Sequence, residues 1–240
     1  MEEKIGMVFA LVVAAGRGHR LGGPIPKQYR LLGGVPVLRH SVLAFLRHPA
    51  IAGVQAVIHP ADRDLYAAAT ADLDLPPPTI GGATRQQSVL LGLEAMAGRN
   101  PGTVLIHDAV RPFVDADTIA AVVAALQRGP AAIAALPVAD TLKRCEGGVI
   151  RATLDRADIW RAQTPQGFRF DAILAAHRAA QRRDPELTDD SAVAELAGIK
   201  IAVVAGSEDN FKITAERDLE RAERLLRHPA GRGRDDAKNT

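Results

Sequence analysis

Five short apolar runs recur along the chain, and each is followed by a polar turn and then by a segment with helical periodicity. The runs are apolar throughout, without the alternation of a strand that has one face in water, which is typical of strands buried on both faces of a sheet. This repeated order constrains the fold more than any single motif does. The runs read MVFALVVAA (7–15), VQAVIHP (54–60), TVLIHDA (103–109), AAIAALPVA (131–139) and KIAVVAG (200–206).

The segments with helical periodicity lie between and after these runs, at 37–48, 62–73, 85–97, 115–128, 170–183 and 215–227. Strands that alternate with helices of this length predict a mostly parallel α/β sheet with right-handed crossovers. In such sheets ligands bind beyond the carboxyl ends of the strands. We therefore expect AAGRG, HDAVRP and GSEDNFK, which follow three of the runs, to lie at the edge that holds the binding site.

The stretch 140–168 breaks this rhythm. Gly147-Gly148 joins two short, half-polar runs, which predicts a β-hairpin arm, about 138–162, that projects from the sheet. The arm carries more apolar surface than an isolated hairpin keeps in water, so we expect it either to fold back on its own subunit or to pack on a partner. Its apolar residues include Ile150, Leu154, Ile159 and Trp160.

The composition is that of a globular protein, with 240 residues of which 47% are hydrophobic. We expect a single domain over 1–227 and a disordered tail at 228–240. A net charge of +2 argues against a broad nucleic-acid-binding surface. The single cysteine, Cys145, excludes an internal disulfide framework, and the first apolar run is too short to span a bilayer. These features predict a cytoplasmic protein without a nucleic-acid or membrane partner.

The first apolar run ends in a glycine-rich loop, AAGRGHRLGGPIPKQY (14–29), which gathers four cations. Such cations would repel one another around a solvated turn, whereas together with glycine N–H groups they suit a polyanion such as a triphosphate. Two common phosphate motifs do not match. Leu21 replaces the third glycine of the dinucleotide pattern, and Pro24-Ile25 replace the Lys-Ser/Thr pair of the P-loop. The cations are Arg17, His19, Arg20 and Lys27.

Further segments carry a resemblance to a known family. After AAGRGHR and PKQY come GGATRQQSV, HDAVRP, PVADTLKR, QTPQGF, TDDSAV and DNFKIT, in the family's order and approximate spacing. Over about 7–226 the chain resembles the methylerythritol phosphate cytidylyltransferases of non-mevalonate isoprenoid synthesis. The resemblance implies a Rossmann-like fold of the nucleotide-diphospho-sugar transferase type. It also implies transfer of the cytidylyl group of CTP to 2-C-methyl-D-erythritol 4-phosphate with release of pyrophosphate.

The resemblance assigns roles to individual residues. The catalytic cations would be Arg20, Lys27 and Lys212. The nucleotide would be bound by Ala14, Ala15, Gly16, Arg17, Gly18, Gly82, Arg85, Ser88, Asp108 and Ala109. The second substrate would be bound by Arg111, Thr141, Arg156, Thr164 and Thr188, and Mg²⁺ by Asp108 and Asp209. An ionised phosphate is already a nucleophile, so catalysis would consist of alignment and charge neutralisation.

Several of these residues also suit ordinary structural roles, which the sequence leaves open. Ser88 can serve the first turn of its helix, Asp209 can form a salt bridge or cap, and Arg156 can be one more exposed cation. Asp108 would be an isolated acid at the end of an apolar strand, which a bound Mg²⁺ would explain. We expect the neighbouring His107 to be a strand residue and not a ligand.

The resemblance further implies a homodimer, in which the hairpin arm carries substrate-binding residues into the neighbour's active site. Three other functions are alternatives to this activity, and the sequence argues against each. A pentitol cytidylyltransferase acting on ribitol 5-phosphate would have an AGGxG opening, where this chain has AAGRG. A nucleotide-binding module without chemistry would not need Lys27, Asp108 and Lys212 together, and Leu21 disfavours a Rossmann oxidoreductase. The chain ends soon after its last predicted helix, so we expect a monofunctional enzyme and not a fusion to a cyclodiphosphate synthase.

Overall fold

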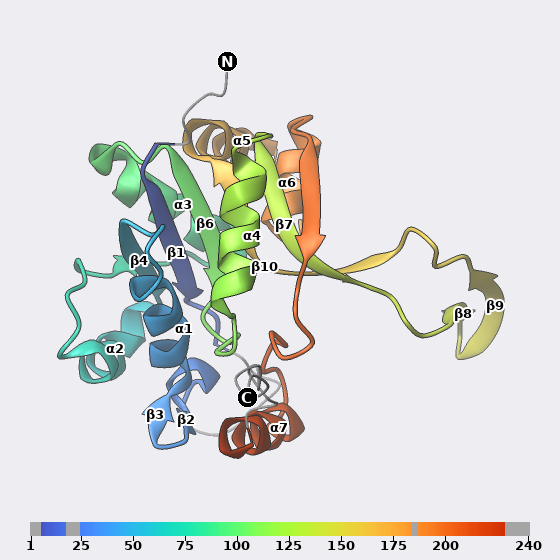
Figure 1. Cartoon of the computed structure of the whole chain (residues 1–240), viewed down its shortest axis with the longest axis horizontal. Coiled ribbons are helices and arrows are strands. Elements are labelled where there is room, and N and C mark those ends of the chain that lie inside the picture. The colour runs from blue at the N-terminus through green and yellow to red at the C-terminus, as the bar shows by residue number, and fades with distance from the viewer. Residues whose placement is uncertain (1–5, 18–24, 184–186, 229–240) are drawn as a thin grey trace, which may run out of the picture.

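The computed structural model shows a central sheet with helices on both faces (Figure 1). The structure describes residues 6–17, 25–183 and 187–228, so that the predicted tail lies outside it except for His228. Within these ranges the main sheet has seven strands in the order β11-β7-β10-β6-β1-β4-β5. Neighbouring strands are parallel except where β10 pairs with β6 and β7. The predicted mostly parallel α/β sheet is therefore confirmed.

All five apolar runs form strands of this sheet, namely β1 (Val8–Ala14), β4 (Gly53–Ile58), β6 (Thr103–Asp108), β7 (Ala131–Pro137) and β11 (Ile201–Ala205). Two further strands, β5 (Thr79–Ile80) and β10 (Trp160–Arg169), were not predicted. Strand β10 contains Pro165 and Gly167, which are both unfavourable inside a strand. Pro165 lies where the pairing of β10 with β7 shifts register, between Ala162 and Gln166. Gly167 is regularly paired and packs so closely that a Cβ there would lie 2.7 Å from Leu126.

The helices also follow the predicted order. The six expected segments form α1 (Val37–Leu46), α2 (Arg63–Thr70), α3 (Arg85–Met96), α4 (Ala116–Leu126), α5 (Phe170–Arg183) and α7 (Glu216–Arg227). A short helix, α6 (Asp190–Leu196), begins inside TDDSAV, where Asp189 accepts a hydrogen bond from the backbone N–H of Ala192 at 2.9 Å. None of the helices in the described part of the chain is long and apolar enough to cross a membrane.

Strand β1 shows why the runs lack alternation. Val8, Ala10 and Val12 pack in one core layer with α1, α2 and α4, while Phe9 and Leu11 pack in the other with α3, α5 and α6. All five of these side chains are buried. Because both faces of the sheet are covered by helices (Figure 1), apolar residues are needed at every position.

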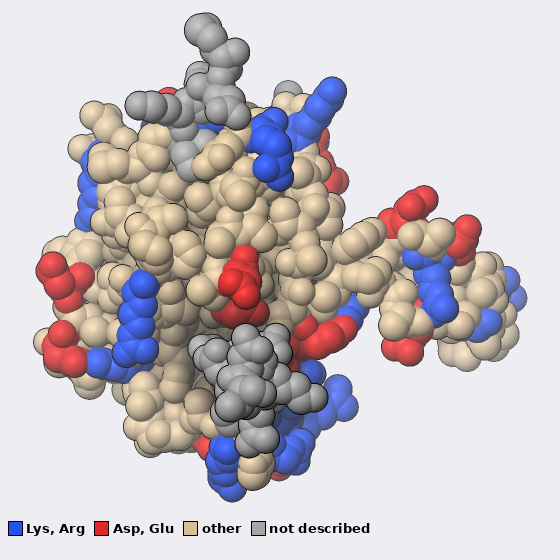
Figure 2. Space-filling view, in the orientation of Figure 1, with Lys and Arg blue, Asp and Glu red and all other residues tan. Residues whose placement is uncertain are grey.

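The arm consists of β8 (Leu142–Glu146) and β9 (Val149–Leu154), which pair antiparallel and project away from the body (Figure 1). Gly147 and Gly148 join them with φ of +55° and +79°, as a type I′ turn requires. Figure 2 shows charged residues of both signs on the arm, beside uncharged surface. The arm does not fold back on its own subunit, so packing on a partner remains the open prediction.

Shorter elements complete the edge of the sheet at which β1 and β6 end. A 3₁₀ turn η1 (Lys27–Tyr29) leads into the hairpin of β2 (Leu31–Leu32) and β3 (Val35–Pro36), and η2 (Pro60–Asp62) follows β4. A third 3₁₀ turn, η3 (Ala97–Arg99), follows the C-terminal end of α3. A small apolar cluster packs α7 and the loop before it against the edge; it comprises Leu32, Val37, Val110, Ile213, Leu219 and Ala222.

Candidate active site

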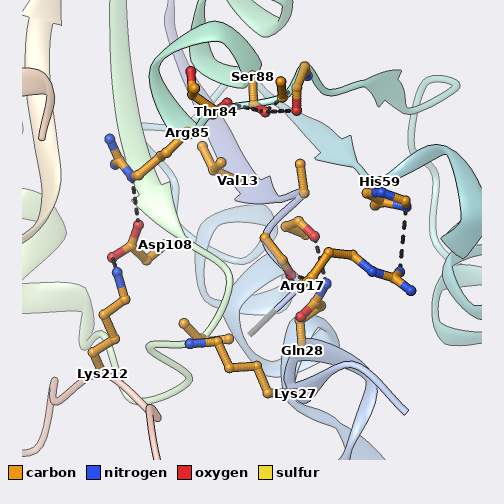
Figure 3. A pocket seen from close by; sticks show the side chains of 16 residues that line it. Val13, Arg17, Lys27, Gln28, His59, Thr84, Arg85, Ser88, Asp108 and Lys212 are labelled. Atoms are coloured by element: carbon orange, nitrogen blue, oxygen red, sulfur yellow. Dashed lines mark hydrogen bonds and ion pairs between the residues drawn. The ribbon is translucent and has the colours of Figure 1, made fainter. Parts of the chain in front are cut away.

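A cavity of about 340 Å³ lies at the carboxyl ends of β1 and β6 (Figure 3). The chain passes from β1 to β4 on one side and later returns to β6 on the other, so the strand order reverses here, where ligand crevices form in doubly wound sheets. Its volume is within the range of small-molecule sites. Among the predicted site residues, those that line it are Ala14, Ala15, Gly16, Arg17, Lys27, Gly82, Arg85, Ser88, Asp108 and Lys212.

Gln28 holds the end of β1 in place beneath the cavity. Its buried side-chain amide donates hydrogen bonds to the carbonyls of Ala14 at 2.7 Å and Gly16 at 3.1 Å. The two carbonyls are thereby satisfied, and the start of the glycine-rich loop is tied to η1. The lysine of PKQY was predicted as a site residue, whereas the neighbouring glutamine of the same motif was not.

Arg17 turns onto a buried carboxylate at the other side of this loop. Its Nη1 donates to Asp62 Oδ1 at 2.7 Å. The same atom lies 3.4 Å from His59 Nδ1 (Figure 3). The Asp62 side chain is only 2% exposed, whereas that of Arg17 is 42% exposed. Asp62 was not predicted, because in the sequence it only begins a helical segment. The predicted residues Gly18 and Arg20 lie outside the described residues.

The loop before α3 forms the second wall. Ser88 Oγ accepts a hydrogen bond from the N–H of Gly82 at 3.1 Å and donates to the carbonyl of Thr84 at 2.8 Å. Thr84 in turn caps α3 by accepting from the N–H of Gln87 at 3.1 Å. A Cβ at Gly82 would lie 2.5 Å from Cγ of Gln87, so the loop is packed closely. Ser88 thus serves the helix start and also lines the cavity.

Asp108 is the centre of a cluster of cations at the end of β6. Lys212 Nζ lies 2.8 Å from Oδ2, Arg85 Nε 3.3 Å from Oδ1, and Arg111 Nε 3.7 Å from Oδ2. Burial alone would raise the pKa of Asp108, but the charges of Arg85, Lys212 and Arg111 outweigh it and hold that pKa well below its usual range. Asp108 is therefore not isolated at the end of its strand, because Arg111 lies nearby in the sequence and Arg85 and Lys212 reach it from distant segments.

Arg85 bridges Asp108 to a second buried carboxylate. Its Nη2 donates to Asp190 Oδ2 at 2.7 Å, and His177 Nε2 lies 3.3 Å from Asp190 Oδ1. Burial would raise the pKa of Asp190, but Arg85 and His177 lower it overall. Asp190 fixes the guanidinium from behind the cavity wall. The motif TDDSAV was noted in the sequence, but only Thr188 was assigned from it.

The other predicted residues do not line the cavity. Ala109 is buried, with its N–H donating to Val13 and its carbonyl accepting from Ser41. Arg111 Nη1 donates to the carbonyl of Asn210 at 2.8 Å, and the hydroxyl of buried Thr164 accepts from the N–H of Asp108 at 3.1 Å.

The remaining predicted residues lie farther from the cavity. Thr188 is exposed just before α6, and Thr141 and Arg156 are exposed at the arm. Asp209 lines a separate depression with Ser207 and Asp115, so the structure does not bring it to Asp108. Its assignment as a second metal contact remains a prediction without structural support.

The cavity as a whole is suited to an anion. Arg17, Lys27, Arg85 and Lys212 line it, and Lys27 Nζ also donates to the carbonyl of Ile213 at 3.1 Å. Within the described residues no group of three or more His, Cys, Asp or Glu side chains is arranged to hold a metal ion. Mg²⁺ bound with a nucleotide needs only one or two carboxylates, because phosphate oxygens and water supply the other ligands. Asp108 fits this requirement.

Residues 8–228 match the model of a family described as IspD: 2-C-methyl-D-erythritol 4-phosphate cytidylyltransferase. The bifunctional enzyme IspD/IspF of Rhodospirillum rubrum is 60% identical over 221 residues, covering 92% of this chain and 57% of that protein. The chain therefore spans little more than half the length of this curated relative. The 2-C-methyl-D-erythritol 4-phosphate cytidylyltransferase of Cereibacter sphaeroides is 47% identical over 226 residues, covering 92% of this chain and 98% of that protein.

Solved structures give the same match. The 4-diphosphocytidyl-2C-methyl-D-erythritol synthase of Anaerococcus prevotii superposes with a TM-score of 0.82 at 28% identity, covering 93% of this chain and 97% of that one. The 2-C-methyl-D-erythritol 4-phosphate cytidylyltransferase of Thermus thermophilus superposes with a TM-score of 0.74 at 34% identity, covering 92% of this chain and 100% of that one. These matches confirm the predicted fold.

Proposed function

Because the chain belongs to the 2-C-methyl-D-erythritol 4-phosphate cytidylyltransferase family, we propose that it transfers the cytidylyl group of CTP to 2-C-methyl-D-erythritol 4-phosphate. The observation that carries the proposal is the cation-lined cavity at the ends of β1 and β6, in which Asp108 gathers Arg85 and Lys212. This arrangement suits a triphosphate and offers no nucleophilic triad. We further propose that residues 1–227 act as one catalytic domain.

In the proposed reaction, a phosphate oxygen of the acceptor attacks the α-phosphorus of CTP. The bond from that phosphorus to the β-phosphate oxygen breaks, and pyrophosphate leaves with the electron pair. Lys27 and Lys212, which approach the cavity from η1 and from the loop before α7, would neutralise charge that develops on the α-phosphate and the leaving group. Binding both substrates in line would supply the rest of the rate enhancement.

The nucleoside end of CTP would lie against the loop before α3. Gly82 and Ser88 line that wall, and the hydroxyl of Ser88 faces the backbone of the loop. Arg85 beside them is held by Asp108 and Asp190 together, so its guanidinium needs little reordering when the ligand binds. The proposed subsites for the cytosine base and for the triphosphate are therefore adjacent, and Asp108 lies where they join.

Mg²⁺ is the metal we propose for this reaction. Asp108 is the carboxylate of this chain that would hold it, with the phosphates of CTP as its other ligands. The ion would supply charge neutralisation and would orient the triphosphate. Because Lys212 and Arg85 already contact the two oxygens of Asp108, the same residues would keep that carboxylate ionised and correctly turned.

We also propose a homodimer in which the arm completes the neighbour's site. Val149, Ile150 and Trp160 are 58%, 60% and 46% exposed, a large apolar surface for a projecting hairpin. Thr141 and Arg156, which the resemblance assigns to the second substrate, lie at this arm and not at the cavity of their own chain. A partner would cover the apolar residues and receive Arg156 as a phosphate ligand.

The test is pyrophosphate release with CTP and Mg²⁺, comparing 2-C-methyl-D-erythritol 4-phosphate with ribitol 5-phosphate. We expect turnover with the former only. Lys27→Ala should lower kcat by about a hundredfold or more, whereas Lys200→Ala, which removes an exposed lysine before β11, should leave it unchanged. Turnover with ribitol 5-phosphate only would move the activity to the pentitol enzymes, and CTP binding without turnover would leave a binding module.

A further inference from the structure

His107 is the residue before Asp108 on β6, and both of its ring nitrogens have partners. The side chain is fully buried, with its ring edge-on to Phe45 at a centroid distance of 4.9 Å. Nδ1 lies 2.9 Å from the hydroxyl of Thr164, and Nε2 lies 3.1 Å from the carbonyl of Arg111. No part of the proposed reaction uses this imidazole.

The partners determine which nitrogen carries the hydrogen. Thr164 Oγ1 accepts from the N–H of Asp108 at 3.1 Å, which leaves its own hydrogen to donate to Nδ1. The carbonyl of Arg111 can only accept, so Nε2 must donate to it. A neutral ring protonated at Nε2 satisfies every group.

These bonds belong to a closed circuit beside the cavity. Asn210, which is fully buried, donates from Nδ2 to the carbonyl of Thr164 at 2.8 Å. The backbone carbonyl of Asn210 accepts from Arg111 Nη1 at 2.8 Å. His107 closes the ring by joining the carbonyl of Arg111 to the hydroxyl of Thr164. The circuit links β6, β10 and the loop before α7, which contribute the groups around Asp108.

We propose that His107 is a positioning residue, which holds the backbone of Arg111 and the hydroxyl of Thr164 and thereby fixes Arg111, the residue that the resemblance assigns to the acceptor substrate. This inference rests on the proposed function. It also assigns the Thr164 hydroxyl to the circuit, where it accepts from Asp108 and donates to His107, in place of the direct substrate contact implied by the resemblance.

Three substitutions distinguish the two hydrogen bonds of His107, one at Nε2 and one at Nδ1. His107→Gln keeps a donor near the Nε2 position, His107→Asn keeps an acceptor near the Nδ1 position, and His107→Phe removes both. We expect His107→Phe to raise KM for the acceptor substrate about tenfold, because it leaves a buried carbonyl and a buried hydroxyl unsatisfied. KM for CTP should rise less, because Arg85 and Lys212 still hold the carboxylate of Asp108. His107→Gln should recover most of the loss, because the carbonyl of Arg111 regains its donor.

A matched control is His48→Gln. His48 is also buried and accepts from the N–H of Ala50 at 3.2 Å. It follows the C-terminal end of α1 and does not line the cavity. This variant should leave both KM values unchanged. Equal increases in the two KM values, or a His107→Gln enzyme as impaired as His107→Phe, would overturn the proposal.

A second readout does not depend on activity. The ¹⁵N shifts of the imidazole nitrogens at pH 7 should show His107 neutral with its hydrogen on Nε2, the signal being assigned by its loss in His107→Gln. Thr164→Val should shift the Nδ1 signal. If the wild-type protein turns over neither acceptor, the proposed function fails while this measurement still tests the circuit. An active enzyme in which His107 is charged, or protonated at Nδ1, would refute the positioning role.

Discussion

Arg17 and Asp62 show how a single ion pair prepares the glycine-rich loop. Arg17→Ala would leave the Asp62 carboxylate buried after the loss of its charged partner, with the Gln28 amide 3.5 Å away. We expect this to lower the free energy of unfolding by about 1–2 kcal/mol, less than for a fully buried pair because Arg17 is partly exposed. Urea denaturation measures it, and adding Asp62→Asn should recover most of the loss.

An exposed ion pair in the same chain is the control. Arg39 donates to both oxygens of Asp72, at 2.6 and 2.7 Å, but Asp72 is exposed to water. Arg39→Ala should therefore lower the free energy of unfolding less than Arg17→Ala does. If Arg17→Ala costs no more than Arg39→Ala, the buried Asp62 does not depend on Arg17.

Asp190 should make stability depend on acid pH. Asp190→Asn removes the buried partner of Arg85 and should lower the free energy of unfolding at pH 7 by about 2–3 kcal/mol. The pKa of Asp190 is depressed in the folded protein. Its stabilisation is therefore complete above the unfolded pKa of about 3.9 and is lost as the pH falls below that value.

Urea titrations from pH 7 to pH 3 would measure this difference between wild type and Asp190→Asn. The gap should stay constant above about pH 5 and narrow below about pH 4. Asp64→Asn, which removes an exposed acid in the first turn of α2, should stay within about 0.5 kcal/mol of wild type throughout. If the difference in the free energy of unfolding between wild type and Asp190→Asn grew as the pH falls, the predicted direction of the pH dependence would be wrong.

For single residues, the sequence predicted which side chains belong to the site better than it predicted which side chains contact one another. Arg85, Asp108 and Lys212 were all named, since each stands in a recognisable motif. That these residues come together was not predicted, because their contacts join distant parts of the chain. Arg85, for example, also contacts Asp190, which lies 105 positions away. Gln28 was missed because the role went to its neighbour Lys27, and Asp190 because the role went to Thr188 of the same motif.

At the scale of elements, α6 connects sheet packing to the cavity. Asp189 caps this helix and also accepts from Gln166 Nε2 on β10 at 2.8 Å. Asp189→Ala should lower the free energy of unfolding by about 1–2 kcal/mol. It should also raise KM for CTP, since the next residue, Asp190, would hold Arg85 less firmly. Denaturation and steady-state kinetics on one preparation would measure both effects.

The cap of α4 gives the comparison. Asp115 accepts from the N–H of Thr118 at 2.7 Å and does not line the cavity. Asp115→Ala should cost similar stability while leaving KM for CTP unchanged. If both variants raised KM alike, the effect would come from general destabilisation and not from the position of Arg85.

Elements were predictable wherever local pattern and tertiary environment agree. The runs that became β1, β4, β6, β7 and β11 are apolar because both faces of the sheet are covered. Strand β10 escaped prediction because Pro165 and Gly167 argue against a strand, and only its neighbours in the sheet stabilise it. Helix α6 was hidden by its short length.

For the whole molecule, the question is whether one chain contains a complete site. The cavity is lined by residues of the body, while Thr141 and Arg156 lie at an arm that projects from it (Figure 1). Apolar side chains at Val149, Ile150 and Trp160 remain exposed there. A symmetric dimer would bury this surface and bring each arm to the neighbouring body, so that assembly and activity would depend on each other.

Mixing two inactive variants tests this dependence. If Arg156 acts in the neighbouring site, Lys27→Ala and Arg156→Ala subunits exchanged in equal amounts should recover about one quarter of wild-type activity, since half of the dimers are hybrid and one of their two sites is intact. The reciprocal mixture is the control. Wild type exchanged with the Lys27→Ala/Arg156→Ala double variant should also retain about one quarter, because every hybrid site then has a defect. If Arg156 acts within its own chain, the first mixture stays inactive and the second retains about one half. A monomer by mass photometry at assay concentration would contradict the dimer itself.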